Sequence, residues 1–195
     1  MNARERLVQS AQELLWERGY GGTSPKAIQE RAGAGQGSMY HHFRSKAAMA
    51  TAALNATAEE ACTELRTALA QDGSPVERLV RYLRQPRQVL RGCRLGQMAQ
   101  DPVIIADPQL RRPVAEAFQQ QHDMLRETLR QAQDAGQLAA DLDPALAASA
   151  VAAVLQGAYT LARAQGSPEP FDQAITGFLQ LCGIAIPADE EANAS

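Results

Sequence analysis

The sequence predicts an all-α fold of about nine helices, in which an N-terminal three-helix module precedes a larger helical domain. Apolar residues recur at every third or fourth position along most of the 195-residue chain, which is the period of an α-helix. Hydrophobic residues make up 45% of the composition, enough to fill the core of a chain this long. Capping residues directly before proline, a pairing that starts helices, recur at Ser24, Ser74, Asp107, Asp143 and Ser167.

The N-terminal module is predicted as three helices, of which the last two form a helix-turn-helix. The first helix is expected to begin near Asn2, where Glu5 completes a capping box, and to end at Gly19. The second begins at Pro25, and the glycine-rich residues 33–35 interrupt its period. A further short helix follows, and two short helices joined by a glycine turn are typical of a helix-turn-helix.

The outer side of the third helix is predicted to present side chains that bind double-stranded DNA. Amide, hydroxyl and imidazole groups reach base edges and phosphate oxygens, and a helix is narrow enough to enter the major groove. Because similar helix pairs occur in ordinary helical domains, the pair alone leaves this interpretation open. The residues expected to read bases are Gln36, Gly37, Ser38, Tyr40 and His41, and those expected to contact phosphates are Thr23, Lys26, His42 and Lys46.

Several residues stand at fixed offsets in this module: Gly19-Tyr20, Thr23-Ser24, Ile28, Ala32-Gly33, Gly37, Met39-Tyr40-His41-His42-Phe43 and Lys46. Over residues 3–50 this pattern resembles the tetracycline-repressor (TetR) family of bacterial regulators. The chain departs from the family at Gly35 and Gln36, where a small hydroxyl residue often caps the recognition helix. The resemblance implies DNA binding and a dimer formed through the last two helices of the regulatory domain.

The charge of the chain is unevenly distributed, although its net value of −3 is unusual for a protein that binds DNA. Residues 1–50 hold seven basic against four acidic side chains, whereas residues 51–195 hold twelve against eighteen. A basic module on an acidic body restricts phosphate attraction to one end of the molecule. Because the basic excess is small, we expect two copies to bind DNA together.

The next two helices are predicted from their caps, and an irregular segment follows them. Ser45 is expected to cap a continuous helix from Lys46 to Gly73. Ser74 begins a capping box for the fifth helix, which ends before Pro86. Residues 85–108 are apolar but poorly periodic, so they either line or cover a cavity or simply connect helices.

A long helix is expected after Asp107-Pro108, reaching Gly136, and Pro113 either bends it or marks its true start. The helix after Asp143-Pro144 carries no charge before Arg163 and approaches the length of a membrane span. We expect no membrane partner, because alanine dominates this helix and no aromatic belt or basic cluster flanks it.

A soluble helix that is apolar on all sides must be covered on all sides, which favours a second subunit. Together with a last helix starting at Ser167-Pro168, it predicts a homodimer with a four-helix interface. The expected interface residues are Val151, Val154, Leu155, Ala158, Phe171, Ile175, Phe178 and Leu179.

The domains are expected at residues 1–46 for DNA binding and 47–187 for ligand binding and dimerisation, with a disordered tail at 188–195. The N-terminus shows no apolar signal segment, so we expect a cytoplasmic protein. The three cysteines lack the C-x-x-C spacing of zinc sites, and no cofactor, metal or catalytic residue is expected.

The sequence predicts a repressor that binds a palindromic operator as a dimer and is released by a small, mostly apolar effector. One alternative keeps DNA binding but makes oxidation of Cys93 the input, or has no input. A helical-bundle enzyme is disfavoured, because the chain has no Glu-x-x-His pair, G-x-S-x-G motif or Walker loop. The candidate effector-pocket residues are Leu65, Leu83, Cys93, Met98, Ile104, Phe118, His122, Leu125, Gln156 and Tyr159.

Overall fold

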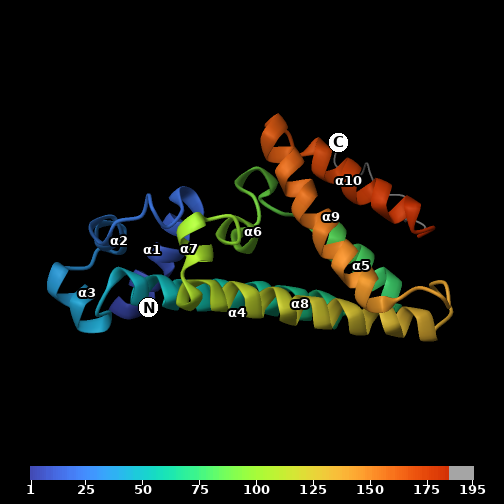
Figure 1. Ribbon diagram of the computed structural model, residues 1–195, viewed down its shortest axis with the longest axis horizontal. Coiled ribbons are helices and arrows are strands. Elements are labelled where there is room, and N and C mark those ends of the chain that lie inside the picture. Colours follow the sequence, from blue (N-terminus) through green and yellow to red (C-terminus); the bar gives the residue numbers. More distant parts are fainter. Residues whose placement is uncertain (185–195) are drawn as a thin grey trace, which may run out of the picture. The chain divides into compact units, whose positions relative to one another are not determined.

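The computed structural model describes residues 1–184, apart from the side chains of Gln36 and Ser38, and this part of the chain is all-α (Figure 1). The predicted fold class is confirmed. The expected disorder of residues 188–195 lies outside the described residues. The helices are α1 (Ala3–Arg18), α2 (Pro25–Ala32), α3 (Gln36–His42), α4 (Lys46–Leu69), α5 (Pro75–Arg84), the 3-10 helix η1 (Val89–Arg91), α6 (Arg94–Met98), α7 (Pro102–Ala106), α8 (Pro108–Asp134), α9 (Pro144–Gln165) and α10 (Glu169–Leu181).

The chain folds as two compact units. Unit 1 comprises Met1–Arg66 and Arg91–Gln121, and unit 2 comprises Thr67–Leu90 and the residues from His122 onward. The division passes within α4 and α8, so each of these long helices contributes residues to both units. The domain boundary expected after residue 46 stays a prediction, and the compact units group the chain differently, since residues 91–121 pack with the N-terminal helices.

The predicted helix starts are confirmed where a local cap specifies them. The Asn2 Oδ1 atom accepts a hydrogen bond from the Glu5 amide at 2.9 Å, and the Glu5 carboxylate accepts one from the Asn2 amide. Ser74 and Glu77 form the same reciprocal pair before α5. Such boxes satisfy amides that have no partner within the first turn of a helix.

The helix α8 begins at Pro108, as expected, and contains Pro113, so Pro113 does not mark its start. The last helix differs slightly from the expectation: it begins at Glu169 with Pro168 as its N-cap residue, and the Ser167 hydroxyl accepts a hydrogen bond from the Glu169 amide at 3.3 Å. This difference concerns the first turn, where helix boundaries are least sharply defined.

The core of unit 1 joins the helix-turn-helix to the segment that the sequence left irregular. Its fully buried side chains include Leu7 of α1, Met39 of α3 and Met49 of α4. Met98 of α6 and Ile104 of α7 lie in the same cluster. From Arg91 onward this segment is therefore a packed part of unit 1 that contains the two five-residue helices α6 and α7. The residues before Arg91, with most of η1, belong to unit 2.

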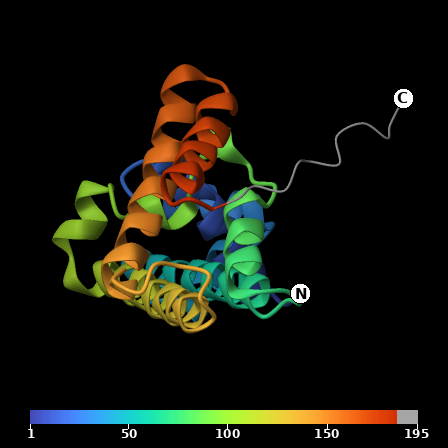
Figure 2. The same ribbon diagram turned by 90° about the vertical axis from the view of Figure 1, so that its right-hand side faces the viewer.

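In unit 2, α9 and α10 lie side by side in both views (Figures 1 and 2), and α5 packs against α10. The rings of Tyr159 on α9 and Phe171 on α10 lie 4.9 Å apart between their centroids. Gly166 ends α9 in the left-handed conformation at φ 65°, which a glycine adopts without the strain that a Cβ atom would cause.

Candidate nucleic-acid interface

The helix-turn-helix is built from α2, a glycine turn and α3, as predicted. The Ser24 hydroxyl accepts a hydrogen bond from the Ala27 amide at 3.1 Å and so caps α2. Gly33 ends α2 with left-handed backbone at φ 58°. Ile28 and Met39 are buried, and they hold the two helices against the core of unit 1. Gly35 precedes α3 without a side-chain cap, which agrees with the departure noted in the sequence.

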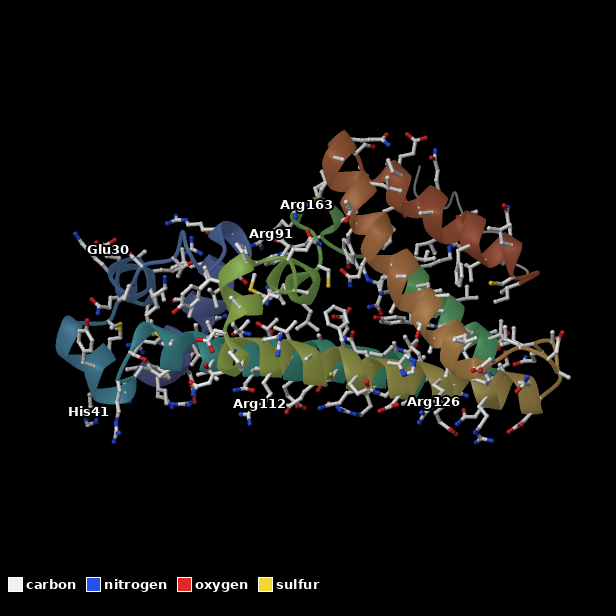
Figure 3. The ribbon with its side chains drawn as sticks, viewed as in Figure 1. Glu30, His41, Arg91, Arg112, Arg126 and Arg163 are labelled. Atoms are coloured by element: carbon white, nitrogen blue, oxygen red, sulfur yellow. The ribbon has the colours of Figure 1, made fainter. Side chains whose placement is uncertain are left out.

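The exposed face of α3 presents Gly37 together with Tyr40 and His41, which follow it by three and four residues and therefore lie on the same side of the helix. Tyr40 is 55% exposed, which is unusual for a large aromatic side chain. His41 points away from the core of unit 1 (Figure 3). Gln36 and Ser38 lie on α3, but their side chains are outside the described part of the structure. The base-reading role of all five residues stays a prediction.

Of the four expected phosphate contacts, Lys26 and His42 are free to reach DNA. The Lys26 side chain is 84% exposed, and its nearest carboxylate belongs to Glu30 at 3.8 Å. An ion pair this exposed contributes little to stability, so exchanging Glu30 for a phosphate has little cost. His42 is exposed at the end of α3, with its ring 5.1 Å from that of His41.

The other two expected contacts already have partners within the chain. The Thr23 side chain is 1% exposed, and its hydroxyl donates to the Gly19 carbonyl at 2.8 Å. A phosphate contact by this side chain would require that hydroxyl to leave Gly19. The Lys46 ammonium donates to the Tyr20 carbonyl at 2.7 Å and lies 4.0 Å from the centre of the Tyr20 ring.

Lys46 keeps donors for a second partner, because an ammonium group carries three N–H bonds. Its burial lowers the pKa of the ammonium, and the negative charge of Asp101 acts in the opposite direction. The phosphate role of Lys46 stays a prediction, as does that of Thr23. In the structure, Lys46 also helps to hold the turn between α1 and α2 through its hydrogen bond to the Tyr20 carbonyl.

Arg4 is a candidate contact that sequence reasoning missed. Its guanidinium carbon lies 5.4 Å from the centre of the Phe43 ring at the end of α3, and the residue is exposed. Position in the sequence gave no sign of this pairing, because Arg4 belongs to α1. Its placement adds an exposed cation near the C-terminal end of α3, and arginines in such positions commonly contact phosphate oxygens.

The candidate effector-pocket residues are divided between the two units. In unit 1, Cys93 is half-buried, and its Sγ atom accepts a hydrogen bond from the Gly96 amide at 3.3 Å. In unit 2, the Nε2 atom of His122 lies 3.1 Å from the Ala145 carbonyl. The effector role of the set stays a prediction. Leu65, Cys93, Met98, Ile104 and Phe118 belong to unit 1, and Leu83, His122, Leu125, Gln156 and Tyr159 belong to unit 2.

A small pocket that was not predicted lies within unit 1. Its volume is about 100 Å³, and α4 and α8 supply its lining, which includes Asn55, Glu59, Cys62 and Gln120. The Cys62 thiol lies 3.7 Å from the Ala117 carbonyl, and burial raises its pKa. The polar lining and small volume distinguish this pocket from the apolar site that the sequence predicts.

Most residues of the expected dimer interface are already buried within the single chain. Only Val154 and Phe178 of that set retain partial exposure. The outward face of α9 carries Leu146 at 70% exposure and Leu161 at 49%, with small exposed residues between them. The contribution of the predicted set to a dimer stays a prediction. Six of its eight members are buried within the single chain: Val151, Leu155, Ala158, Phe171, Ile175 and Leu179.

Within the described residues, α9 is the one helix whose length and composition would allow it to cross a membrane, with a mean hydropathy of 1.5 over its most apolar window. Of that window, 28% is buried in the structure. The same length and composition suit a helix that is covered partly by its own chain and partly by a second subunit.

Comparison with known proteins places both halves of the chain in one family. Residues 7–53 match the family described as "Bacterial regulatory proteins, tetR family", and residues 74–178 match "Tetracyclin repressor-like, C-terminal domain". The HTH-type transcriptional repressor DhaR of Mycobacterium sp. strain GP1 is 29% identical over 177 residues, or 89% of this chain and 88% of DhaR. The transcriptional regulator AcuR of Cereibacter sphaeroides is 29% identical over 176 residues, covering 86% and 80%.

Solved structures agree with this fold. The regulatory protein TetR from Rhodobacter sphaeroides superposes with a TM-score of 0.80 at 28% identity, covering 93% of this chain and 97% of that protein. The reduced form of Escherichia coli NemR gives a TM-score of 0.82 at 22% identity, covering 96% and 100%, which supports the fold alone.

Proposed function

Because this chain belongs to the TetR family of transcriptional regulators, we propose that it is a dimeric repressor that binds a palindromic operator and is released by a small effector. Membership makes it a DNA-binding regulator rather than an enzyme, and a regulator of this kind acts in the cytoplasm. The observation that best supports the proposal is the exposed face of α3, where Gly37, Tyr40 and His41 stand together. The name of the relative DhaR, a repressor, supports the direction of control.

A homodimer accounts for the outward apolar face of α9 and for the weak charge of one DNA-binding module. Two modules related by a two-fold axis bind an inverted repeat whose half-sites lie one or more helical turns apart. Each module brings few cations, so a single copy would gain little from phosphate contacts. Linking two copies raises affinity without any new contact in either half-site.

The proposed effector is small and mostly apolar, in keeping with the apolar candidate residues of unit 1, such as Met98 and Phe118. Release requires it to bind one conformation more tightly than the other. A hundredfold fall in DNA affinity needs a difference of about 2.7 kcal/mol in binding free energy between the two states.

Two substitutions on the helix-turn-helix should separate base reading from phosphate binding. Tyr40→Ala should abolish the preference for the operator over unrelated duplex, because it removes an exposed side chain on the base-reading face. Lys26→Ala should weaken binding to all sequences alike and lower the slope of log affinity against log salt by about one. Fluorescence anisotropy with an operator selected from random duplexes, over a salt series, measures both. An equal loss of specificity in the two variants would contradict these roles.

In the alternative, oxidation of Cys93 and not an effector controls DNA binding. The thiol is only half-buried, so an oxidant can reach it. Its Sγ atom caps α6. Cys93→Ser keeps a capping oxygen at the same place, so α6 should persist. We expect hydrogen peroxide to leave operator binding of both the unaltered protein and the variant unchanged. Loss of binding that occurs in the unaltered protein and not in Cys93→Ser would establish the alternative.

A further inference from the structure

The segment Arg91–Ala106, here called the α1 strap, packs against α1 within unit 1. It contains α6, which contacts α1, and α7, whose Ile104 lies in the core that α1 shares with α3 and α4 (Figure 1). The strap is anchored to α1 at its first end and, near its second end, to the turn that follows α1. Its position is therefore fixed relative to the helix that supports the helix-turn-helix.

The first anchor is a charged cluster over Trp16. The guanidinium carbons of Arg91 and Arg94 lie 3.5 and 4.4 Å from the centre of the Trp16 ring. Both arginines also pair with the Glu13 carboxylate, at 2.9 and 2.6 Å. Trp16 is 8% exposed, so the two cations cover an aromatic face that would otherwise meet solvent.

The second anchor is the carboxylate of Asp101, which has partners on two elements. Its Oδ1 atom accepts hydrogen bonds from the Val103 and Ile104 amides at 2.9 and 3.1 Å and so caps α7. Its Oδ2 atom accepts one from the Tyr20 amide at 2.7 Å. One side chain therefore joins the start of α7 to the turn that follows α1.

The turn held by Asp101 is the one that sets where α2 begins. The Tyr20 carbonyl accepts from the Thr23 amide and from the Lys46 ammonium at the start of α4. The close approach requires glycine at position 19, since a Cβ atom there would lie 2.8 Å from Asp101 Oδ2 and the φ angle is 67°. Both backbone groups of Tyr20 are thus fixed by side chains from other elements.

We propose that Asp101 is a positioning residue for operator recognition, which ties the strap to the α1–α2 turn and so holds the helix-turn-helix in its DNA-binding geometry. The inference rests on the proposed function and adds to it a residue far from α3. It also connects the strap to DNA binding. Because Asp101 bonds both α7 and the Tyr20 amide, a displacement of α7 would move the α1–α2 turn and the start of α2.

A pair of matched variants separates this role from simple helix capping. Asp101→Ser keeps a good N-cap for α7, but its shorter side chain cannot also reach Tyr20. Asp143→Ser makes the same change at α9, where the Asp143 carboxylate bonds the Ala145 and Leu146 amides. Both variants remove one negative charge, and charge alone predicts tighter binding to DNA.

We expect Asp101→Ser to weaken operator binding by about tenfold, the worth of a hydrogen bond to a charged group, whereas Asp143→Ser binds as the unaltered protein does. Binding to unrelated duplex should not weaken, because phosphate contacts tolerate a displaced helix. The Tyr20 amide should exchange with solvent faster in Asp101→Ser, as measured by hydrogen-exchange NMR on the full chain.

If Asp101→Ser does not fold, Asp101→Asn serves in its place, because its single amide oxygen can accept from α7 or from Tyr20 but not from both. Operator binding equal to or tighter than that of the unaltered protein overturns the inference, as does an equal loss in Asp143→Ser or unchanged exchange at Tyr20. If the unaltered protein selects no operator, the proposed function fails instead, and the Tyr20 exchange still tests the anchor.

Discussion

Replacing Gly157 by glutamate should convert the proposed dimer to monomers and weaken operator binding by more than about a hundredfold. Gly157 lies on the exposed face of α9, and a Cβ atom there would meet nothing within 4 Å, so the single chain tolerates the change. In a two-fold interface each substitution occurs twice, which brings two carboxylates into an apolar contact. Like charges buried in that way cost several kcal/mol. Sedimentation velocity and fluorescence anisotropy measure the two effects.

A matched control is Ala115→Glu on α8, where an exposed alanine receives the same charge. This variant should sediment and bind operator as the unaltered protein does. A Gly157→Glu protein that still sediments above the 21.0 kDa of one chain and still binds operator would show that α9 is not the interface.

The bounds of α9 can be predicted from the sequence, but the side of α9 that faces the core cannot. The helix bounds follow from local signals, since Asp143 caps the first turn and Gly166 ends the last. The inward face does not follow, because apolar residues occupy both sides of α9. Charge at Leu155, the obvious test from the sequence, would disturb the fold of the monomer, since that side chain is 8% exposed.

The helix-turn-helix can be predicted from the sequence because, like the bounds of α9, it depends on local signals. Its caps, glycine turn and alternation of buried and exposed positions are all encoded within about twenty residues of sequence. The contacts that position it are long-range: the Asp101 carboxylate and the Tyr20 amide are separated by 81 residues. The motif in which Asp101 precedes Pro102 predicts a helix cap, but nothing in it indicates a second partner.

The irregular segment, residues 85–108, could not be predicted in this way, because its helices are short. The helices α6 and α7 have five residues each, which is too short for a periodic pattern to be recognised. The sequence identified their apolar residues but offered two interpretations for them. Packing against α1 decides where Met98 and Ile104 lie, and such packing depends on residues far away in the chain.

Ile104→Ala should destabilise unit 1 by about 2–5 kcal/mol, because the side chain is fully buried in the core that α7 shares with α1, α3 and α4. Its neighbour provides the control: Ile105 is 38% exposed, so Ile105→Ala removes the same atoms at a cost of about 0.5 kcal/mol or less.

Urea unfolding followed by Trp16 fluorescence measures the difference, since the chain has one tryptophan and it lies in unit 1. Equal costs for the two variants would mean that α7 is not part of the core beneath the DNA-binding helices. A large difference would instead show that the stability of the helix-turn-helix depends on a segment about sixty residues beyond it, because α3 shares its core with Ile104.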